Sequence, residues 1–408
     1  MTSTGTAAHP EPLSLARGEV KLDPPTHFGR WRSEAPLRRI TLWNGETAWV
    51  ALSYEAVRAV FKDSARFRSE PGTPGFPTIN QADSASKGAA LLPMLDPPAH
   101  TALREAVLRE FIVKRIESLR PEAARIVAGL LDAMASAAGP ADPVDLITAL
   151  AAPVPATFTC LLLGVPLADA AFFAECLDVR FTPTSATEAV YGADDRLRRY
   201  FRDLVTARAA HPRDDLSSRL VTGSVLTGKL SAEDAAALLH VLLIGGFDTT
   251  KQMIALSTVT LLGHRPQLAE LMAAPALWRG AVQELLRYIS VAQVERRACV
   301  ADTEVCGQLI RAGEGVLVLL GSANRDPDVF GDPDRFDIHR RDLPHVAFGH
   351  GIHQCLGQPV ARMLLSVTLP ALFARFPRLS LAVPVEELRF RDDRSLIGVS
   401  ELPVRTRP

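Results

Sequence analysis

The most informative stretch of the sequence is Phe348-Gly349-His350-Gly351-Ile352-His353-Gln354-Cys355-Leu356-Gly357-Gln358-Pro359-Val360-Ala361-Arg362. Three glycines surround its single cysteine, and glycine allows tight turns and close approach of the backbone to a flat partner. The run over residues 360–373 predicts a helix after the turn, with Pro359 in its first turn, where a missing N–H costs little. N–H groups at a helix start stabilise negative charge and lower the pKa of a nearby thiol. The stretch therefore favours a thiolate at Cys355, whereas a bare Cys-x-Gly would indicate only a turn with an inert, buried cysteine.

The composition is that of a globular protein able to enclose a large prosthetic group. The 408 residues are 47% hydrophobic and 22% charged with a net charge of −1, so nothing global indicates nucleic acid as a partner. The five cysteines include no Cys-x-x-Cys pair and are an odd number, which argues against a disulfide framework and for a reducing cytosol. Residues 1–20 contain no long apolar run, so neither a signal peptide nor a membrane anchor is expected. We therefore expect a cytoplasmic protein.

The pattern of the chain predicts a mainly α fold with a small β portion. Residues 1–25 are expected to form a flexible arm, and residues 26–408 a single domain. Alternating residues on both sides of Asn44-Gly45 predict a hairpin, and Ser53 is expected to cap the short helix that follows. Further helices are expected over residues 100–119, 121–138, 146–163, 169–180, 186–210, 231–264, 267–273, 276–288 and 360–373, and short strands over residues 294–321 and 379–404.

Two segments have the composition of mobile loops. Residues 67–90 are rich in Gly, Pro, Ser and Asn without a clear period, and residues 181–187 are rich in Pro, Ser and Thr. Long loops in compact proteins are usually functional or mobile, and lids come from the least stable parts of a structure. We expect these two segments to form a lid.

The expected long helix contains two adjacent glycines, Gly245 and Gly246, followed by Asp248 and Thr249. Each glycine costs about 1 kcal/mol relative to alanine inside a helix, so the pair needs a reason. Thr249 can donate to the Gly245 carbonyl four residues earlier and open the helix locally. Two interpretations remain open: a groove with an acid and an alcohol for a small molecule and a proton path, or a close contact between helices.

A second helical motif is Glu284-Leu285-Leu286-Arg287, which places opposite charges three residues apart. Taken alone, such a pair is an ordinary surface ion pair worth a few tenths of a kcal/mol. Its meaning depends on what surrounds it in the fold.

The cysteine stretch completes the pattern Phe-x-x-Gly-x-x-x-Cys-x-Gly with Phe348, Gly351, Cys355 and Gly357, and this resembles the haem-binding loop of the cytochromes P450. Together with the two helical motifs, the resemblance extends in family order over residues 94–362 and is to the soluble actinobacterial kind. It implies the cytochrome P450 fold, with haem b (iron protoporphyrin IX) between the long oxygen-binding helix and the cysteine-loop helix. It also implies that Cys355 is the axial thiolate ligand of the iron, which promotes O–O cleavage.

The resemblance implies roles for further residues. Asp248 and Thr249 would be the catalytic acid–alcohol pair, with Gly245 and Gly246 in the oxygen-binding groove. Glu284 and Arg287 would be a buried structural pair tied to residues 324–327 and 333–336. The haem contacts implied by the family are His100, Arg104, Arg297 and His353 at the propionates, and Phe348, Gly349 and Gly357 in the loop. Whether Arg297 or its neighbour Arg296 faces the haem depends on register, and Arg297 lies ten residues before Gly307, as in relatives.

The implied activity is that of a monooxygenase, which uses O2 and two electrons from a ferredoxin and its reductase or a similar donor. Arg362 and the basic segment over residues 109–120 would form the face that steers an acidic ferredoxin or flavodoxin, although they could also be an ordinary solvated face. The pocket candidates are mostly apolar and small, which suggests a bulky lipophilic or natural-product substrate. Besides the loop over residues 67–90, they are Val241, Gly245, Val291, Ala292, Leu396 and Ile397.

Other functions remain open. Residues 163–166 and 381–384 resemble the fungal nitric oxide reductases of the same superfamily, but those enzymes lack the acid that is present here as Asp248. A peroxide- or nitric oxide-using enzyme and a haem sensor without turnover are therefore the alternatives. Departures from the family pattern are modest: residues 358–360 replace a more usual small-residue helix start, Pro370 is expected to kink or shorten the last helix, and His350 is unusual in the turn.

Overall fold

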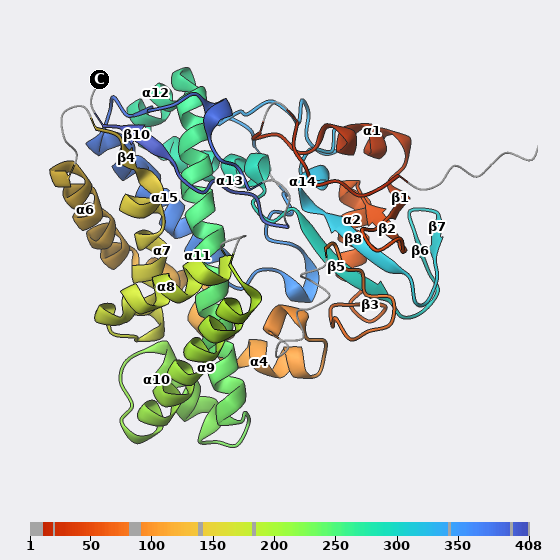
Figure 1. Ribbon diagram of the computed structural model, residues 1–408, viewed down its shortest axis with the longest axis horizontal. Coiled ribbons are helices and arrows are strands. Elements are labelled where there is room, and N and C mark those ends of the chain that lie inside the picture. Colours follow the sequence, from red (N-terminus) through yellow and green to blue (C-terminus); the bar gives the residue numbers. More distant parts are fainter. Residues whose placement is uncertain are drawn as a thin grey trace, which may run out of the picture.

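The computed structural model describes residues 11–18, 21–80, 91–137, 142–181, 185–341, 344–391 and 395–406. A helical region and a β-rich region lie side by side, and the long helix α11 runs through the helical region (Figure 1). The helices are α1 (Thr26–Glu34), α2 (Tyr54–Lys62), α4 (Ala99–Leu108), α5 (Val113–Glu117), α6 (Arg120–Ala137), α7 (Pro153–Leu163), α8 (Ala170–Phe181), α9 (Thr187–Ala210), α10 (Leu216–Leu220), α11 (Ala232–Gly263), α12 (Arg265–Ala273), α13 (Trp278–Ile289), α14 (Leu320–Ala323) and α15 (Gln358–Arg375). The predicted fold class, mainly α with a small β portion, is confirmed.

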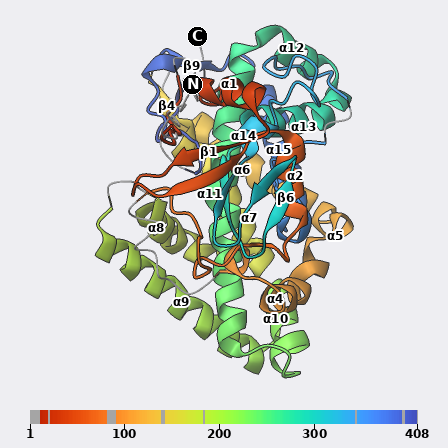
Figure 2. The ribbon, with the colours of Figure 1, turned by 90° about the vertical axis from the view of Figure 1, so that its right-hand side faces the viewer.

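The β-rich region is built on a five-stranded sheet in the order β1-β2-β8-β5-β3. Figure 2 shows the β-rich region from its outer side, with the helical region behind it. Strand β2 pairs in parallel with β8, and the other pairs are antiparallel. Two small sheets, β4-β10-β9 and β6-β7, complete the strands. The bounds are β1 (Leu37–Thr41), β2 (Thr47–Ala51), β3 (Phe67–Arg68), β4 (Val144–Asp145), β5 (Val294–Cys299), β6 (Thr303–Val305), β7 (Gln308–Ile310), β8 (Gly315–Leu319), β9 (Ser380–Leu381) and β10 (Pro403–Arg405).

The central helix α11 is buried on most sides because it packs against helices all around it. Its neighbours include α7, α9, α13 and α15. Ser231 caps its start in a reciprocal capping box with Asp234, which satisfies two N–H groups that the first turn would leave unpaired. A helix enclosed in this way is normally apolar on all sides. The buried polar residues of α11, among them Asp248, Lys251 and Gln252, therefore need a specific explanation.

Local signals in the sequence predicted several elements correctly. The hairpin of β1 and β2 forms around Asn44-Gly45, and the Ser53 side chain accepts from the N–H of Ala56 at the start of α2. The helix expected over residues 100–119 is instead broken. A 3-10 turn follows α4, and extended backbone at Ile112 separates it from α5. Pro370 does not shorten α15, which continues to Arg375.

The arm predicted over residues 1–25 is not loose where the structure describes it. Leu13 donates its N–H to Thr41, and Glu11 forms ion pairs with Arg30 and Arg38. These contacts hold the segment against β1. Residues 1–10 and 19–20 lie outside the described residues.

The first half of the predicted lid is also anchored. The Asp96 carboxylate accepts from the N–H groups of Ser69 and Glu70. Gly75 has a φ of +81° and lies so close to Gly313 that an added Cβ would be 2.1 Å from its carbonyl oxygen. Residues 67–80 thus make defined contacts with the rest of the fold, and their movement as a lid stays a prediction, whereas residues 81–90 and 182–184 lie outside the described part of the chain.

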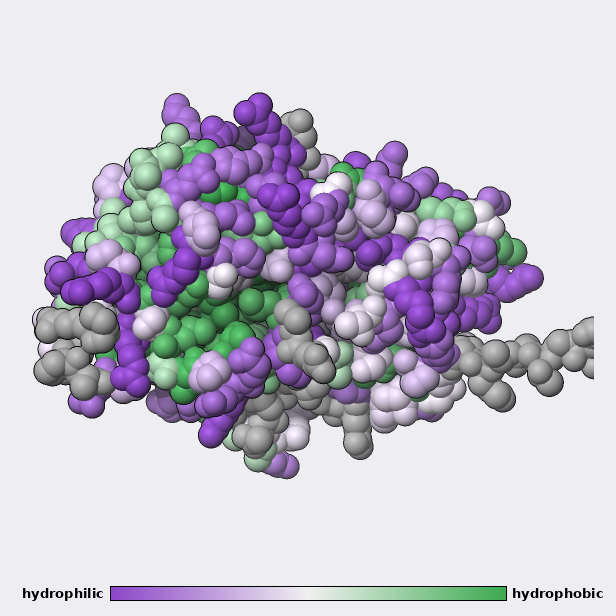
Figure 3. Space-filling model, turned by 90° about the horizontal axis from the view of Figure 1, so that it is seen from above, coloured by the Kyte–Doolittle hydropathy of each residue, from purple (hydrophilic) through white to green (hydrophobic). Residues whose placement is uncertain are grey.

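One face of the molecule shows hydrophobic residues gathered in a hollow with hydrophilic residues around it (Figure 3). Within the described residues, no helix is both long enough and apolar enough to cross a membrane. The long apolar helix α11 is enclosed by other helices.

Candidate active site

The loop before α15 turns tightly around Cys355. The N–H of Cys355 donates to the Phe348 carbonyl at 2.9 Å, which closes the loop. Gly349 and Gly351 have φ angles of +68° and +73°, which side chains rarely adopt. A Cβ on Gly351 would also lie 2.3 Å from the carbonyl oxygen of Phe61 at the end of α2. These two glycines are needed for the turn and for its close contact with α2.

The Cys355 sulfur lies at the start of α15, in a setting that suits a thiolate ligand. Burial raises the pKa of the Cys355 thiol, while the N–H groups of Gly357 and Gln358 and the guanidinium groups of Arg104 and Arg362 act to lower it. Cys355 nevertheless retains accessible surface. A deeply placed sulfur that is still accessible, with donors directed at it, can bind a metal ion once its proton is released.

The other cysteines lack this setting. Cys160, Cys176 and Cys299 are buried, and burial raises the pKa of the Cys160 thiol to about 11. Cys306 lies half-buried in the turn between β6 and β7, where burial also raises its thiol pKa. Only Cys355 combines accessibility with donors at its sulfur among these five.

Two histidines from different segments meet beside the cysteine loop. The rings of His100 on α4 and His353 in the loop have centroids 4.3 Å apart. His353 Nε2 lies 3.1 Å from the Ser69 hydroxyl and 3.9 Å from an oxygen of Asp96. Sequence analysis did not single out Ser69 or Asp96, which orient His353 and fix the segment after β3.

The cationic side chains expected at the propionates lie in the same region. Arg104 donates to the carbonyl of Gln354 at 2.7 Å, next to the cysteine. Arg297 is only 4% exposed, and burial lowers the pKa of its guanidinium, with Asp96 among the charges that oppose this shift. Arg296 lies on the opposite face of β5 and stacks on Phe76. Alternation along the strand thus selects Arg297 as the inward-facing arginine.

A haem fits this arrangement of groups. The Nδ1 atoms of His100 and His353 are buried, and neither has a hydrogen-bond partner among the described residues. Buried polar atoms without partners are rare, and the two carboxylates of a haem would supply acceptors for them and for Arg297. With an accessible sulfur beside these donors, the fold and the site suit a haem protein, in which Cys355 would be the thiolate ligand.

Glycines open one side of α11 and allow a close contact on another. The Thr249 hydroxyl donates to the Gly245 carbonyl at 2.9 Å. A Cβ on Gly245 would meet nothing within 4 Å, whereas one on Gly246 would lie 3.2 Å from the Thr159 hydroxyl of α7. The close contact between helices is therefore confirmed for Gly246. At Gly245 there is open space near a hydroxyl group, and a groove with a proton path at this position stays a prediction.

Asp248, the expected catalytic acid, lies buried in a cluster of ion pairs. Its side chain is 2% exposed and is held between two cations, Lys251 at 2.8 Å and Arg391 at 3.0 Å. Neither cation was identified from the sequence. Lys251 lies three residues further on the same helix, a spacing that could have revealed it, but Arg391 is far away in the sequence.

The pocket candidates fall into two groups. Ala292 and Leu396 are half-buried and face each other in a β-bridge. Val291 and Ile397, their neighbours, are joined by a backbone hydrogen bond of 2.9 Å and are buried in the main core, as is Val241. Because side chains alternate along extended backbone, only one residue of each adjacent pair can face a pocket. Ala292 and Leu396 therefore share one face, and which of the four residues line a substrate pocket stays a prediction.

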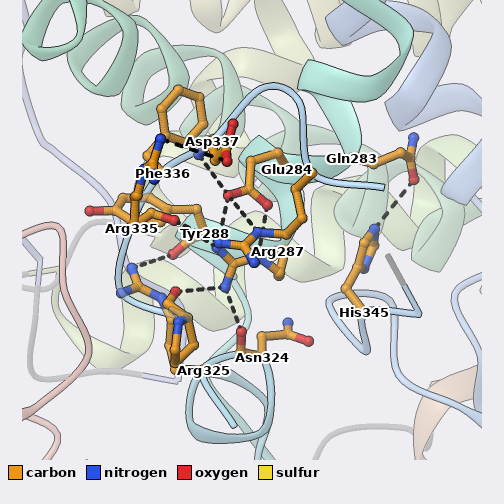
Figure 4. Close-up of polar contacts among 12 residues, drawn as sticks. Gln283, Glu284, Arg287, Tyr288, Asn324, Arg325, Arg335, Phe336, Asp337 and His345 are labelled. Atoms are coloured by element: carbon orange, nitrogen blue, oxygen red, sulfur yellow. Dashed lines mark hydrogen bonds and ion pairs between the residues drawn. The ribbon is translucent and has the colours of Figure 1, made fainter. Parts of the chain in front are cut away.

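Glu284 and Arg287 form a fully buried ion pair with two hydrogen bonds of 2.8 Å (Figure 4). Arg287 also donates to the carbonyls of Asn324 and Pro333 at 2.8 Å, and Glu284 accepts from the N–H of Asp337 at 3.0 Å. The pair thus forms a junction between α13 and the chain at Asn324, Pro333 and Asp337. It is not a surface ion pair.

This junction is connected to the cysteine loop through Asn324. The Asn324 side chain accepts from the N–H of Val346 at 2.8 Å, and the carbonyl of Val346 accepts from the N–H of Gly349. Movement of the junction would therefore be transmitted to the loop that presents Cys355.

Arg362 is not a free surface cation. It is half-buried, donates to Gln283 and Gln358, and lies over the Phe348 ring at 4.6 Å. Its side chain supports the cysteine loop but keeps part of its surface accessible, so its place on a basic face stays a prediction.

The burial of His345 predicts that the free energy of unfolding decreases in acid. Burial lowers the pKa of His345 to about 3, with Arg362 and Arg287 adding to the shift. Below an unfolded value near 6.5, the unfolded chain binds a proton that the folded chain excludes, so this group costs about 1 kcal/mol of stability per pH unit as pH falls. His345→Gln should therefore lose less stability than the wild type between pH 7 and pH 5.5, measured by thermal unfolding. His211→Gln, at an exposed histidine, is the control. An unchanged pH dependence in His345→Gln would contradict the prediction.

Comparisons with known proteins agree with this architecture. A family model described as Cytochrome P450 matches residues 257–397. Cytochrome P450 105A3 of Streptomyces carbophilus is 43% identical over 388 residues, 93% of this chain and 92% of the relative. Vitamin D3 dihydroxylase of Streptomyces griseolus is 43% identical over 371 residues, 90% of each chain. The crystal structure of mycinamicin VIII C21 methyl hydroxylase from Micromonospora griseorubida, bound to mycinamicin VIII, superposes with a TM-score of 0.87 at 37% identity, over 97% of this chain and 98% of that one.

The chain belongs to the cytochrome P450 family. It is a monooxygenase, and its cofactor is haem.

Proposed function

We propose that this monooxygenase hydroxylates a bulky lipophilic natural product in the groove beside Gly245 and Thr249. The observation that carries the proposal is the open side of α11, where Gly245 leaves free space next to a hydroxyl group. Two relatives act on large lipophilic compounds according to their names, vitamin D3 and mycinamicin VIII. Per turnover, O2, two electrons, two protons and a C–H bond of the substrate yield the hydroxylated product and one water.

In this proposal the cofactor is held by the side chains already described. Bound haem supplies oxygen activation, which a thiolate ligand promotes. Cys355 would bind the iron, and the surrounding residues would orient the cofactor. Those assigned to its propionates are His100, Arg104, Arg297 and His353, and those assigned to its proximal side are Phe348, Gly349 and Gly357.

The chain's own contribution to the reaction is proton delivery on the distal side. The Thr249 hydroxyl can hold a proton-bearing group at the groove, and its bond to the Gly245 carbonyl fixes its direction. Asp248, one residue earlier, is the carboxyl group that replaces the proton. A positioned acid of this kind typically contributes about 10²–10⁴-fold to rate.

Thr249→Ala and Asp248→Asn test this role. Thr249→Ala should produce peroxide in place of product, and Asp248→Asn should slow NAD(P)H oxidation by about 10²-fold, because each removes one group of the relay. The measurement is product and peroxide formed per NAD(P)H consumed. Thr258→Ala is a matched control, since Thr258 makes the same bond to the carbonyl four residues earlier on α11. If both test variants remain coupled at wild-type rates, a peroxide- or nitric oxide-using enzyme becomes the better assignment.

We further propose that an acidic ferredoxin or flavodoxin supplies the electrons at the face near the cysteine loop. In α5, which contacts α15, Val113 is 64% exposed and follows Ile112, which is 50% exposed. Ile352 of the cysteine loop is also exposed, and Arg109 and Lys114 carry positive charge beside the apolar residues. Apolar side chains with a basic rim suit a small acidic protein, and the charges would mainly raise the rate of association.

The substrate class can be tested directly by titration. Candidate macrolide, sterol and other lipophilic compounds are added to the ferric protein while the Soret band is followed. A compound that binds beside the iron shifts the band, and a saturable shift at micromolar concentration would support the proposal. Shifts confined to small polar compounds would contradict it.

A further inference from the structure

The Asp248 carboxylate is bound by two cations that come from different parts of the fold. Lys251 Nζ lies 2.8 Å from one oxygen and Arg391 Nη2 3.0 Å from the other. The three side chains are 2%, 7% and 10% exposed, in the order Asp248, Lys251 and Arg391. Burying a cluster with one carboxylate and two cations is costly, so its retention calls for an explanation.

The two cations differ in what they can do. Lys251 lies on α11 itself, three residues after Asp248, and moves with that helix. Arg391 belongs to two paired segments, residues 388–391 and 396–400, here called the hairpin, in which its N–H donates to the Gly398 carbonyl at 2.8 Å. Arg391 is therefore the cation that connects the acid to a separate segment.

This hairpin is seated firmly on α11. The Gln252 side chain accepts from the N–H of Val399 at 2.9 Å and donates to its carbonyl at 3.2 Å. A Cβ on Gly398 would lie 2.3 Å from Gln252 Cδ, so the backbone approaches as closely as glycine allows. The attachment holds Arg391 at a defined depth relative to α11.

The same hairpin contributes to the substrate side. Leu396 is half-buried and bridges to Ala292, and both are candidates for the pocket wall. The hairpin thus carries a candidate pocket residue and the cation that binds the acid.

We propose that Arg391 is a positioning residue that fixes the Asp248 carboxyl group for proton delivery to the Thr249 groove. The inference rests on the proposed role of Asp248 in that delivery. With Arg391 in place, one carboxylate oxygen accepts a hydrogen bond from the hairpin and the other lies within ion-pair distance of Lys251, so both oxygens face a cation. A catalytic group must be held within about 0.5 Å of its working position, and a second anchor from a separate segment serves this demand.

Loss of Arg391 frees one carboxylate oxygen, and protons then reach the groove without fixed direction. NAD(P)H, one proton and O2 then yield NAD(P)+ and hydrogen peroxide, and the substrate remains unoxidised. This outcome differs from loss of Asp248, which removes the acid itself and slows consumption of NAD(P)H.

The experiment compares Arg391→Gln and Arg391→Lys in the haem-loaded enzyme with an identified substrate. Arg391→Gln should lower product per NAD(P)H about tenfold, with a matching rise in peroxide, because small misplacements of catalytic groups have effects of at least this size. The rate of NAD(P)H oxidation, the carbon monoxide spectrum and the substrate dissociation constant should change by less than about twofold if the pocket and the haem are intact. Arg391→Lys should fall between wild type and Arg391→Gln, since an ammonium keeps the charge without the reach of the guanidinium. Arg389→Gln, at an exposed arginine of the same hairpin, should behave as wild type.

A second measurement does not depend on turnover. The effects of Asp248→Asn and Arg391→Gln on thermal unfolding should be non-additive, because each removes the same ion pair. Full coupling in Arg391→Gln, or additive effects on thermal unfolding, would overturn the proposal. If Arg391→Gln gives no folded protein, Arg391→Lys decides, and full coupling in that variant would be the overturning result.

The proposed relay can fail separately. If Asp248→Asn is fully coupled at the wild-type rate, Asp248 is not the acid and the role of Arg391 falls with it. If Asp248→Asn is slow while Arg391→Gln stays coupled, the relay stands and only the positioning role is wrong.

Discussion

Cys355→Ser is expected to abolish the red-shifted Soret band that reduced, thiolate-ligated haem shows with carbon monoxide. Cys355 is the one cysteine of the five with accessible surface and N–H groups directed at its sulfur. Serine is nearly the same size but remains protonated at neutral pH, so it cannot replace a thiolate as electron donor to the iron. Monooxygenase turnover should fall below detection.

The loop itself should survive this substitution. Its shape depends on Gly349, Gly351 and the bond from the residue-355 N–H to the Phe348 carbonyl, and none of these involves the sulfur. Folded protein should therefore be recovered, with haem bound weakly through its propionates or lost on gel filtration. Cys306→Ser, at the other cysteine that is not fully buried, is the control and should keep the band. Retention of the band in Cys355→Ser would show that another residue binds the iron.

Much of this site could be predicted because its signals are local. The cysteine loop is specified by glycines within ten residues, and the Thr249 bond to the Gly245 carbonyl follows from helix geometry alone. The hairpin at Asn44-Gly45 and the Ser53 cap are similar cases, in which a turn or cap residue has one structural use.

What could not be predicted depends on contacts between distant segments. No residue near Asp248 in the sequence indicates that Arg391 is its partner. The two are 143 residues apart and meet only when the C-terminal hairpin packs on α11. The sequence alone indicates a surface cation at Arg362, and only the fold shows that Gln283 and Phe348 lie beside it. Composition could not show that Asp96 anchors the start of a Gly- and Pro-rich segment either. A polar side chain has several possible partners, and only the tertiary structure selects among them.

The alternation of side chains along extended backbone is a third case, in which the sequence narrows the possible orientations without selecting one. Val291 with Ala292 and Leu396 with Ile397 lie on extended backbone, so one residue of each pair had to face the core. The pattern cannot say which one, because all four are apolar. The bridge between Ala292 and Leu396 shows which two share a face, and that bridge joins segments about a hundred residues apart.

Glu284→Ala is expected to leave little folded, haem-loaded protein. Removing one member of a buried ion pair leaves the other charge without compensation, at a cost of about 3–5 kcal/mol. Here the orphaned charge is Arg287, which is fully buried. Domains have only about 5–15 kcal/mol of stability in total, so the loss is a large share of it.

The cost should be concentrated at the cysteine loop. Arg287 holds the carbonyls of Asn324 and Pro333, and Asn324 in turn holds the N–H of Val346, three residues before Gly349. Haem retention should therefore decrease before the helical core unfolds. The measurement is the ratio of haem absorbance to protein absorbance in purified material, followed by the midpoint of thermal unfolding.

Graded substitutions separate charge from shape at this junction. Glu284→Gln keeps an acceptor for the Asp337 N–H but loses the charge, and Arg287→Lys keeps the charge but cannot make two parallel bonds. Both should retain more haem than Glu284→Ala. Arg279→Ala, at an exposed arginine of the same helix, should change stability by no more than about 0.5 kcal/mol. Normal yields of haem-loaded Glu284→Ala would mean that the pair contributes little, and that the loop is held by its own glycines and by its contact with α2.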